Sequence, residues 1–145
     1  MIVDEVIARV ETASADLAGR VEGAGELTAL VRERALPQMT PAAFVLPLGL
    51  RAGAADSVSG LFRQLADEVV AVVLVVEVAG DVTGGAALPT IDALVAGVID
   101  GVCGWKPAGE IGSFRLDRGR LVAVDRGVVI YQLDFAIPRQ LRIQA

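Results

Sequence analysis

Apolar residues near the start of the chain recur at the spacing of one helix face, with charged residues between them. They are Val3, Val6, Ile7, Val10 and Leu17. This pattern predicts an amphipathic helix over residues 2–19, whose early acidic residues suit the positive end of the helix dipole. A shorter apolar set, Leu27, Leu30 and Val31, predicts a second helix that stops before Pro37.

A third helical pattern begins at Pro89 and Thr90 and ends between Gly101 and Gly104. Proline is favoured in the first turn of a helix and glycine just beyond its last turn. The apolar stripe of this predicted helix consists of Ile91, Leu94, Val95, Val98 and Val102.

Two apolar runs between these helices have the character of strands. The run VVAVVLVVEV is β-branched and almost unbroken, which predicts a strand over residues 69–79 that is buried on both faces. The run FVLPLGL, residues 44–50, contains Pro47, which cannot donate a hydrogen bond to a neighbouring strand. We therefore expect it at a sheet edge or with a β-bulge.

Two other segments, 51–60 and 80–87, are rich in glycine, alanine and small polar residues. Their composition predicts surface loops. Segments with few large apolar side chains stay mobile until a contact holds them. We therefore expect the loops, taken as 51–65 and 80–88, to shift or become ordered when a partner binds.

The last third of the chain predicts a β-meander. Strands over 111–116, 120–125 and 128–137 are separated by turn signals at 117–119 and 125–127. In the last strand, one face consists of Val129, Tyr131, Leu133, Phe135 and Ile137. This alternation indicates an antiparallel strand with one face on the core.

Together these elements predict an α+β fold, in which a mainly antiparallel sheet with a closing meander packs against helices on one side. At 145 residues, of which 54% are hydrophobic, the chain is long enough for one domain with a substantial core. We expect that domain to span residues 1–145.

Several classes of function are disfavoured by composition. There is no histidine, and the single cysteine cannot form an internal disulfide, so metal sites and triads that need histidine are excluded. The first residues are acidic where a signal peptide is basic, and the longest apolar run is too short to span a bilayer as a helix. We expect a soluble protein made in the cytoplasm.

The net charge of -5 argues against a nucleic-acid binder with a simple basic surface. Charge is also unevenly distributed along the chain. Residues 1–105 carry 6 basic and 14 acidic side chains, a net charge of −8, whereas residues 106–145 carry 7 and 4, a net charge of +3. Two interpretations remain open: solvated faces of one domain, or head-to-tail pairing of unlike surfaces between copies.

Each candidate catalytic motif lacks a residue or a spacing that its chemistry requires. The glycines after Val78 lack the spacing of a phosphate-binding loop. Asp67 and Glu68 are adjacent, so in a strand they point to opposite faces. Cys103 has no histidine beside it and is better explained as a small core residue. We therefore expect no catalytic residue, no cofactor and no bound metal.

The only tryptophan, Trp105, follows the third predicted helix and precedes the meander. A bulky ring at this elbow can cover the open end between the helix layer and the sheet, while Pro107 fixes the direction in which the chain leaves. An interface anchor is the alternative, because tryptophan is enriched at binding hot spots.

A helix that ends in GWKP, the segment FRLDRGRLVAVDRGVVIYQLDFAI and the basic tail RQLR follow one another from residue 104 to residue 142. This part of the chain resembles the tail terminator proteins of long-tailed bacteriophages. The resemblance extends in element order over the whole chain. It implies an N-terminal helix, a sheet with a long inserted loop, a crossing helix and a closing β-meander.

The resemblance also implies a structural, non-enzymatic protein of the virion. Such proteins are expected to form a homohexameric ring on the tail tube in the neck region, to stop tube polymerisation and to offer a surface for head joining. The implied partners are further copies of the chain, the major tail tube protein and a head–tail connector or stopper protein, without a membrane or sequence-specific nucleic acid.

For the ring we predict interface residues from charge and exposed apolar character. They are Leu61, Phe62, Arg63, Arg118, Arg120 and Arg126, with Trp105 and Pro107 as the structural elbow. Two alternatives remain: another head–tail connector or tail-completion protein, and a host-encoded, non-catalytic α+β module for ligand binding or dimerisation. A ligand module would show a closed apolar pocket.

Overall fold

The computed structural model describes residues 2–58, 60–78, 85 and 87–144. Its elements, in chain order, are α1 (Ile2–Ala13), the 3-10 helix η1 (Ala15–Leu17), β1 (Val21–Glu22), α2 (Ala24–Glu33), β2 (Ala42–Val58), β3 (Leu61–Glu77), α3 (Leu88–Val102), β4 (Arg115–Asp125) and β5 (Val128–Gln144). The strands form one sheet with the order β1-β2-β3-β5-β4, in which all neighbours but β1 and β2 are antiparallel. The expected α+β class is confirmed.

The first helix is shorter than predicted. It ends at Ala13, because Ser14 adopts an extended conformation with φ −145° and ψ 132°. The short helix η1 then turns Leu17 into the core, where it is fully buried. The helical spacing of Leu17 was therefore coincidental, although its place in the core was predicted correctly.

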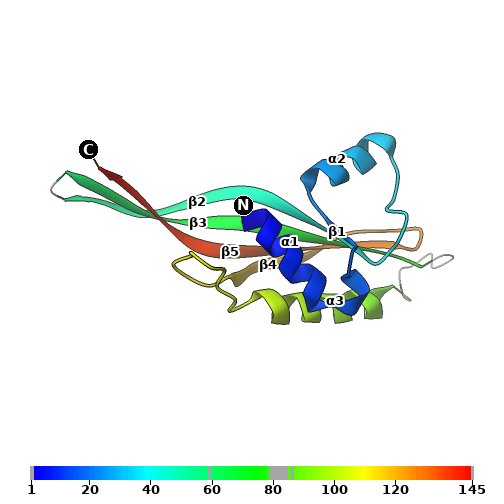
Figure 1. Cartoon of the computed structure of the whole chain (residues 1–145). Coiled ribbons are helices and arrows are strands. Elements are labelled where there is room, and N and C mark those ends of the chain that lie inside the picture. The colour runs from blue at the N-terminus through cyan, green and yellow to red at the C-terminus, as the bar shows by residue number, and fades with distance from the viewer. Residues whose placement is uncertain (1, 59, 79–84, 86, 145) are drawn as a thin grey trace.

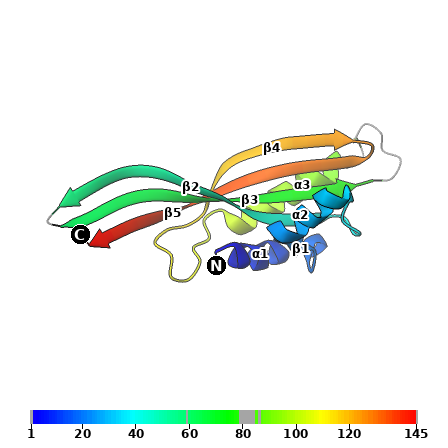
Figure 2. The same ribbon diagram turned by 90° about the horizontal axis from the view of Figure 1, so that it is seen from above.

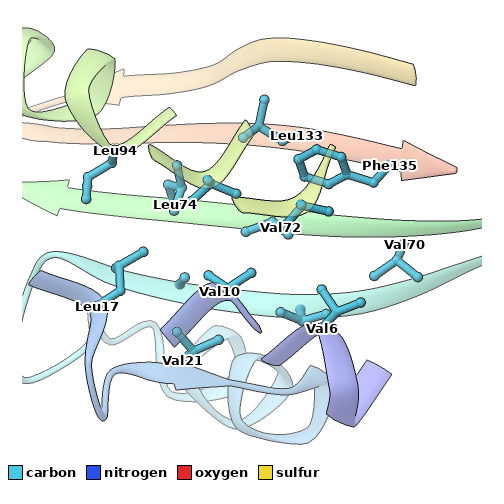
Figure 3. Close-up of a cluster of buried hydrophobic side chains, with 14 of the residues drawn as sticks. Val6, Val10, Leu17, Val21, Val70, Val72, Leu74, Leu94, Leu133 and Phe135 are labelled. Atoms are coloured by element: carbon cyan, nitrogen blue, oxygen red, sulfur yellow. The ribbon is translucent and has the colours of Figure 1, made fainter. Parts of the chain in front are cut away.

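The centre of β3 is buried on both faces, as its β-branched run predicts. Val70, Val72 and Leu74 pack against α1 and α3 in one cluster, and Val73 and Val75 lie in a second cluster on the other face. Figure 3 shows the first cluster, in which side chains of α1, α3, β3 and β5 meet. The strand itself extends well before residue 69, to Leu61, and ends at Glu77.

The helices do not all pack on one side of the sheet, which corrects the prediction. In β2, Ala43 and Val45 belong to the cluster under α1 and α3, whereas Ala42 and Phe44 lie in the cluster that Leu27 and Leu30 of α2 contact. Successive side chains of a strand point to opposite faces, so α2 lies on the face opposite to α1 and α3. Figure 1 shows α2 on the far side of the sheet from these two helices.

The loop predicted at 51–60 is wrong. Strand β2 continues to Val58, and β3 begins at Leu61, because the two strands pair along this whole stretch. Pairing with β3 satisfies the backbone, so small polar side chains do not prevent a strand here. A turn that includes Gly60, with a φ of 78°, connects the strands. The second predicted loop lies almost entirely outside the described residues.

The prediction for Pro47 is confirmed. A β-bulge follows it, between Pro47 and Gly49, and β1 pairs with β2 only at Ala43 and Phe44. The outer side of Pro47 therefore faces no neighbouring strand among the described residues.

The closing meander has two strands rather than three. The turn expected at 117–119 is a β-bulge between Leu116 and Arg118, and β4 runs through it to Asp125. The turn at 125–127 is confirmed, since Arg126 and Gly127 have positive φ values of 50° and 83°. The alternation of β5 is also confirmed, with Val129, Leu133, Phe135 and Ile137 buried on one face.

The sheet is much longer than the helix layer that covers it. Beyond the helices, β2, β3 and β5 continue as a three-stranded extension, which we call the arm and define as residues 50–58, 61–67 and 138–144. Figure 2 shows the arm at one end of the molecule and the β4–β5 turn at the other.

Candidate functional site

The structure separates the predicted interface residues into two groups. Leu61, Phe62 and Arg63 open β3 at the tip of the arm and are partly exposed. Arg118 and Arg120 are exposed in β4, and Arg126 is exposed in the β4–β5 turn at the opposite end of the sheet. The two groups therefore cannot form one site within a single copy.

One face of the arm is largely apolar. Residues that pair directly across neighbouring antiparallel strands share a face of the sheet. In the arm, Phe62 of β3 pairs with Ile143 of β5, and Leu50 of β2 pairs with Glu68 of β3. This face, which continues the face covered by α1 and α3, carries Leu50, Ala52, Ala55, Phe62, Ala66, Leu141 and Ile143. Leu50 is 63% exposed and Ile143 58% exposed, so the arm presents apolar surface that the body of the chain does not cover.

The other face of the arm carries most of its charged side chains, together with Leu61 and the exposed Leu65. Arg63 forms an ion pair with Asp56, with 3.1 Å between Nε and Oδ1. Arg142 lies directly opposite Arg63 in the sheet register and forms no ion pair with a described residue. Like charges directly opposite each other are destabilising. Asp56 compensates Arg63, whereas no carboxylate of the described residues compensates Arg142.

Ion pairs hold the arm to the body on one face. We call this junction the waist; it surrounds Arg51, Asp67 and Pro138, which are aligned in register. Arg51 binds Asp117 with 2.6 Å between Nη2 and Oδ2, and Arg115 binds Asp67 at 2.5 Å between the same atom types. Each pair joins β4 to a strand that is not its neighbour in the sheet.

On the opposite face of the waist, Arg139 binds two carboxylates at once. Its guanidinium lies 2.6 Å from Glu68 and also contacts Glu110, whose side chain is only 12% exposed. Asp67 and Glu68 thus point to opposite faces, as their adjacency in a strand predicted. Their arginine partners, Arg115 and Arg139, are distant along the chain, so no local sequence pattern points to them.

The ion pairs of the waist shift the pKa values of Asp117 and Arg139. The hydrogen bond from Arg51 lowers the pKa of the Asp117 carboxyl, and the nearby charge of Arg51 adds to the effect. Burial by itself would lower the pKa of the Arg139 guanidinium, but hydrogen bonds to Glu68 and Glu110 outweigh that effect, so the pKa is raised. Both shifts favour the charged forms of these side chains.

Trp105 lies at the elbow between α3 and β4. Its ring stacks on Phe114 with 5.6 Å between centroids, and backbone hydrogen bonds connect Trp105 and Gly104 to Phe114. Pro107 is buried close by. The tryptophan is partly exposed and packs against the rim of the main core cluster.

A groove lies between α2, the segment 35–39 and the sheet, and has a volume of about 560 Å³. Its apolar lining includes Leu30, Leu36, Pro37, Met39, Ala42 and Phe44. Three carboxylates, from Glu22, Glu26 and Glu33, belong to the same lining. The sequence pattern did not point to this groove, because it depends on the side of the sheet that α2 occupies.

Across the part of the chain that the structure describes, no three His, Cys, Asp or Glu residues are grouped so that they could hold a metal ion. Cys103 is half-buried against the main core cluster. Among the same residues, no helix is long and apolar enough to cross a membrane.

The comparisons with known proteins agree with this picture. A chain from the "Virion of native gene transfer agent (GTA) particle" has a similar fold, with a TM-score of 0.53 and 16% sequence identity over 99% of this chain and 92% of that chain. No curated protein matches the sequence. The family model for "Phage tail terminator protein" matches residues 1–145. The chain therefore belongs to the phage tail terminator family and is a structural protein of the virion tail.

Proposed function

We propose that the chain acts as a single domain that forms a ring at the head-proximal end of the tail tube. The ring stops tube polymerisation and provides the surface for head joining. The family match supports the tail location, and a six-membered ring is the form that the family resemblance implies. The major tail tube protein and a head–tail connector or stopper protein are the proposed partners.

The proposal of a ring rests on one observation, the separation of acidic and basic surfaces within one copy. Exposed acidic residues Asp4, Glu5, Asp92 and Asp100 lie on α1 and α3. The exposed arginines Arg118, Arg120 and Arg126 lie on β4 and its turn. Unlike surfaces pair heterologously, and such contacts form a closed ring when the rotation between copies closes.

Surface ion pairs are individually weak, at about 0–1 kcal/mol each. The apolar residues Leu61 and Phe62 at the arm tip supply burial that charge alone does not. We therefore expect the ring to depend on both groups of residues, and the tube end to act as its template.

The test reverses the charge of β4. A chain with Arg118→Glu, Arg120→Glu and Arg126→Glu should fold, because all three side chains are exposed. In a complementation assay it should produce overlong or headless tails, which electron microscopy would detect. The matched control replaces the same three residues with lysine and should give tails of normal length.

Normal tails from the glutamate variant would refute pairing through these arginines. A phage whose gene for this chain carries an early stop codon should make tails of abnormal length. If its tails have normal length and still join heads, tube termination itself is refuted.

A further inference from the structure

Helix α2 leaves an unfilled groove on the molecule. It is amphipathic, yet none of its residues is buried, and only Leu27 and Leu30 pack partly against the sheet. In the adjoining groove Leu36 is 42% exposed and Met39 is 60% exposed. An apolar groove with a charged rim is typical of a surface that receives a partner.

The outer strand of the arm has the complementary chemistry. Strand β4 begins opposite Ala136, so no strand of the described residues lies beside the part of β5 after Ile137 on that edge. Here Leu141 and Ile143 are exposed apolar residues, 39% and 58% exposed, and Arg142 between them is exposed as well. A three-stranded extension without a covering layer gains stability when such residues are buried.

Charge is complementary between the two surfaces. Arg142 has no ion-pair partner among the described residues, and Arg63 opposite it already binds Asp56. The groove carries Glu22, Glu26 and Glu33 against a single arginine in its lining, Arg20. Leu141 and Ile143 point to one face of the edge strand, and Arg142 points to the other. Both faces of an edge strand are accessible, so a groove that receives this edge can contact all three side chains.

The arm cannot reach the groove of its own chain. Figures 1 and 2 show the arm at one end of the long sheet and α2 toward the other, and paired strands hold them apart. We infer that the outer strand of the arm, residues 138–144, lies in the α2 groove of a second copy, with Leu141 and Ile143 toward its apolar lining and Arg142 toward its carboxylates.

A second copy explains both surfaces better than a different protein does. Every copy has one uncovered arm and one unfilled groove, and head-to-tail contacts satisfy both in every copy of a closed ring. The inference thus rests on the proposed ring and names its contact. The apolar residues contribute the affinity, while the charges set the direction of docking.

A disulfide test can detect this contact. The full chain, with Cys103→Ala to remove the native thiol, carries Met39→Cys in the groove and Ile143→Cys on the arm. Oxidation of tails assembled with this chain should give a ladder of covalent multimers on a non-reducing gel. The ladder should disappear on reduction, and neither single-cysteine chain should produce it.

The matched control pairs Met39→Cys with Leu50→Cys. Leu50 is on the same face of the arm and is 63% exposed, but it belongs to β2, on the opposite edge. It should give no ladder. Rings seen by native mass spectrometry without the Ile143 crosslink, or equal ladders from both pairs, would overturn the arm contact and leave the ring proposal standing.

A charge exchange tests the direction of docking. Arg142→Glu and Glu33→Arg should each lower the yield of the Ile143 crosslink several-fold, and the two together should restore it. Failure of the double variant to restore the yield while it remains folded overturns the contact between Arg142 and the rim. A chain that is monomeric in solution and absent from tails overturns the ring and the arm contact together.

Discussion

Arg9 of α1 lies over the ring of Trp105, with 5.1 Å between its guanidinium carbon and the ring centroid. Its Nε also donates a hydrogen bond to the carbonyl oxygen of Gly101, at 2.7 Å. One side chain therefore joins the N-terminal helix to the last turn of α3 and to the elbow that follows it. Cation–π contacts of this kind are strongest with tryptophan.

Truncation at the elbow should destabilise the fold. We expect Trp105→Ala to lower the free energy of unfolding by about 3 kcal/mol, the lower end for a large aromatic truncation, because the ring is half-buried. Urea denaturation followed by circular dichroism measures this, since the variant lacks the only tryptophan. Trp105→Phe retains stacking on Phe114 and should lose less. Unchanged stability with lost assembly would instead make Trp105 an interface anchor.

Helices α1 and α3 approach closely at Gly101. A Cβ atom on Gly101 would lie 2.7 Å from the Cβ of Ala13, whereas one on Gly97 would be 3.4 Å from its nearest neighbour. Alanine normally stabilises a helix relative to glycine by about 0.5–1 kcal/mol. We nevertheless expect Gly101→Ala to destabilise the protein, by about 1–3 kcal/mol, because the helices must separate.

Two further variants decide the cause. Adding Ala13→Gly should recover part of the loss in thermal unfolding, because it removes the clashing methyl group. Gly97→Ala should be neutral or stabilising. If Gly101→Ala stabilises the protein as helix propensity predicts, the close approach of the two helices is refuted.

The two-residue turn between β4 and β5 should accept a better turn sequence. Arg126 has a φ of 50°, which costs free energy for a residue with a side chain, and Gly127 follows it with a φ of 83°. Asn-Gly is favoured in such turns, so Arg126→Asn should raise stability by about 0.5–1 kcal/mol. Gly127→Ala should lower it. Calorimetric melting temperatures in the opposite order would contradict the turn geometry.

The waist should have a characteristic acid sensitivity. The pKa of Asp117 lies below its ordinary value of 3.8, chiefly through the hydrogen bond from Arg51. Because the pKa is lowered in the folded state, the pair stabilises the fold at pH values above the ordinary pKa. This contribution is lost as the pH falls through the folded-state pKa. Arg51→Met should therefore raise the pKa of Asp117 in an NMR titration of its side-chain carboxyl. An unchanged pKa would show that the pair does not form in solution.

Several features could be predicted from the sequence because they depend on local pattern. The apolar stripe of α3, the buried run of β3 and the alternation of β5 all reflect the period of one element facing one core. The turn at Arg126 and Gly127 also follows from its own residues. The uneven charge of the chain, basic over residues 106–145 and acidic over residues 1–105, can be read directly from the sequence.

Tertiary structure alone decided the length of the sheet and the shape of the candidate interface. Residues 51–58 have loop-like side chains, yet they form a strand because β3 satisfies their backbone hydrogen bonds. The ion pairs of the waist, such as Arg51 with Asp117, join residues far apart in the chain. The groove depends on α2 crossing to the second face of the sheet, and the period of a helix shows that it has an apolar side but not which surface that side will cover.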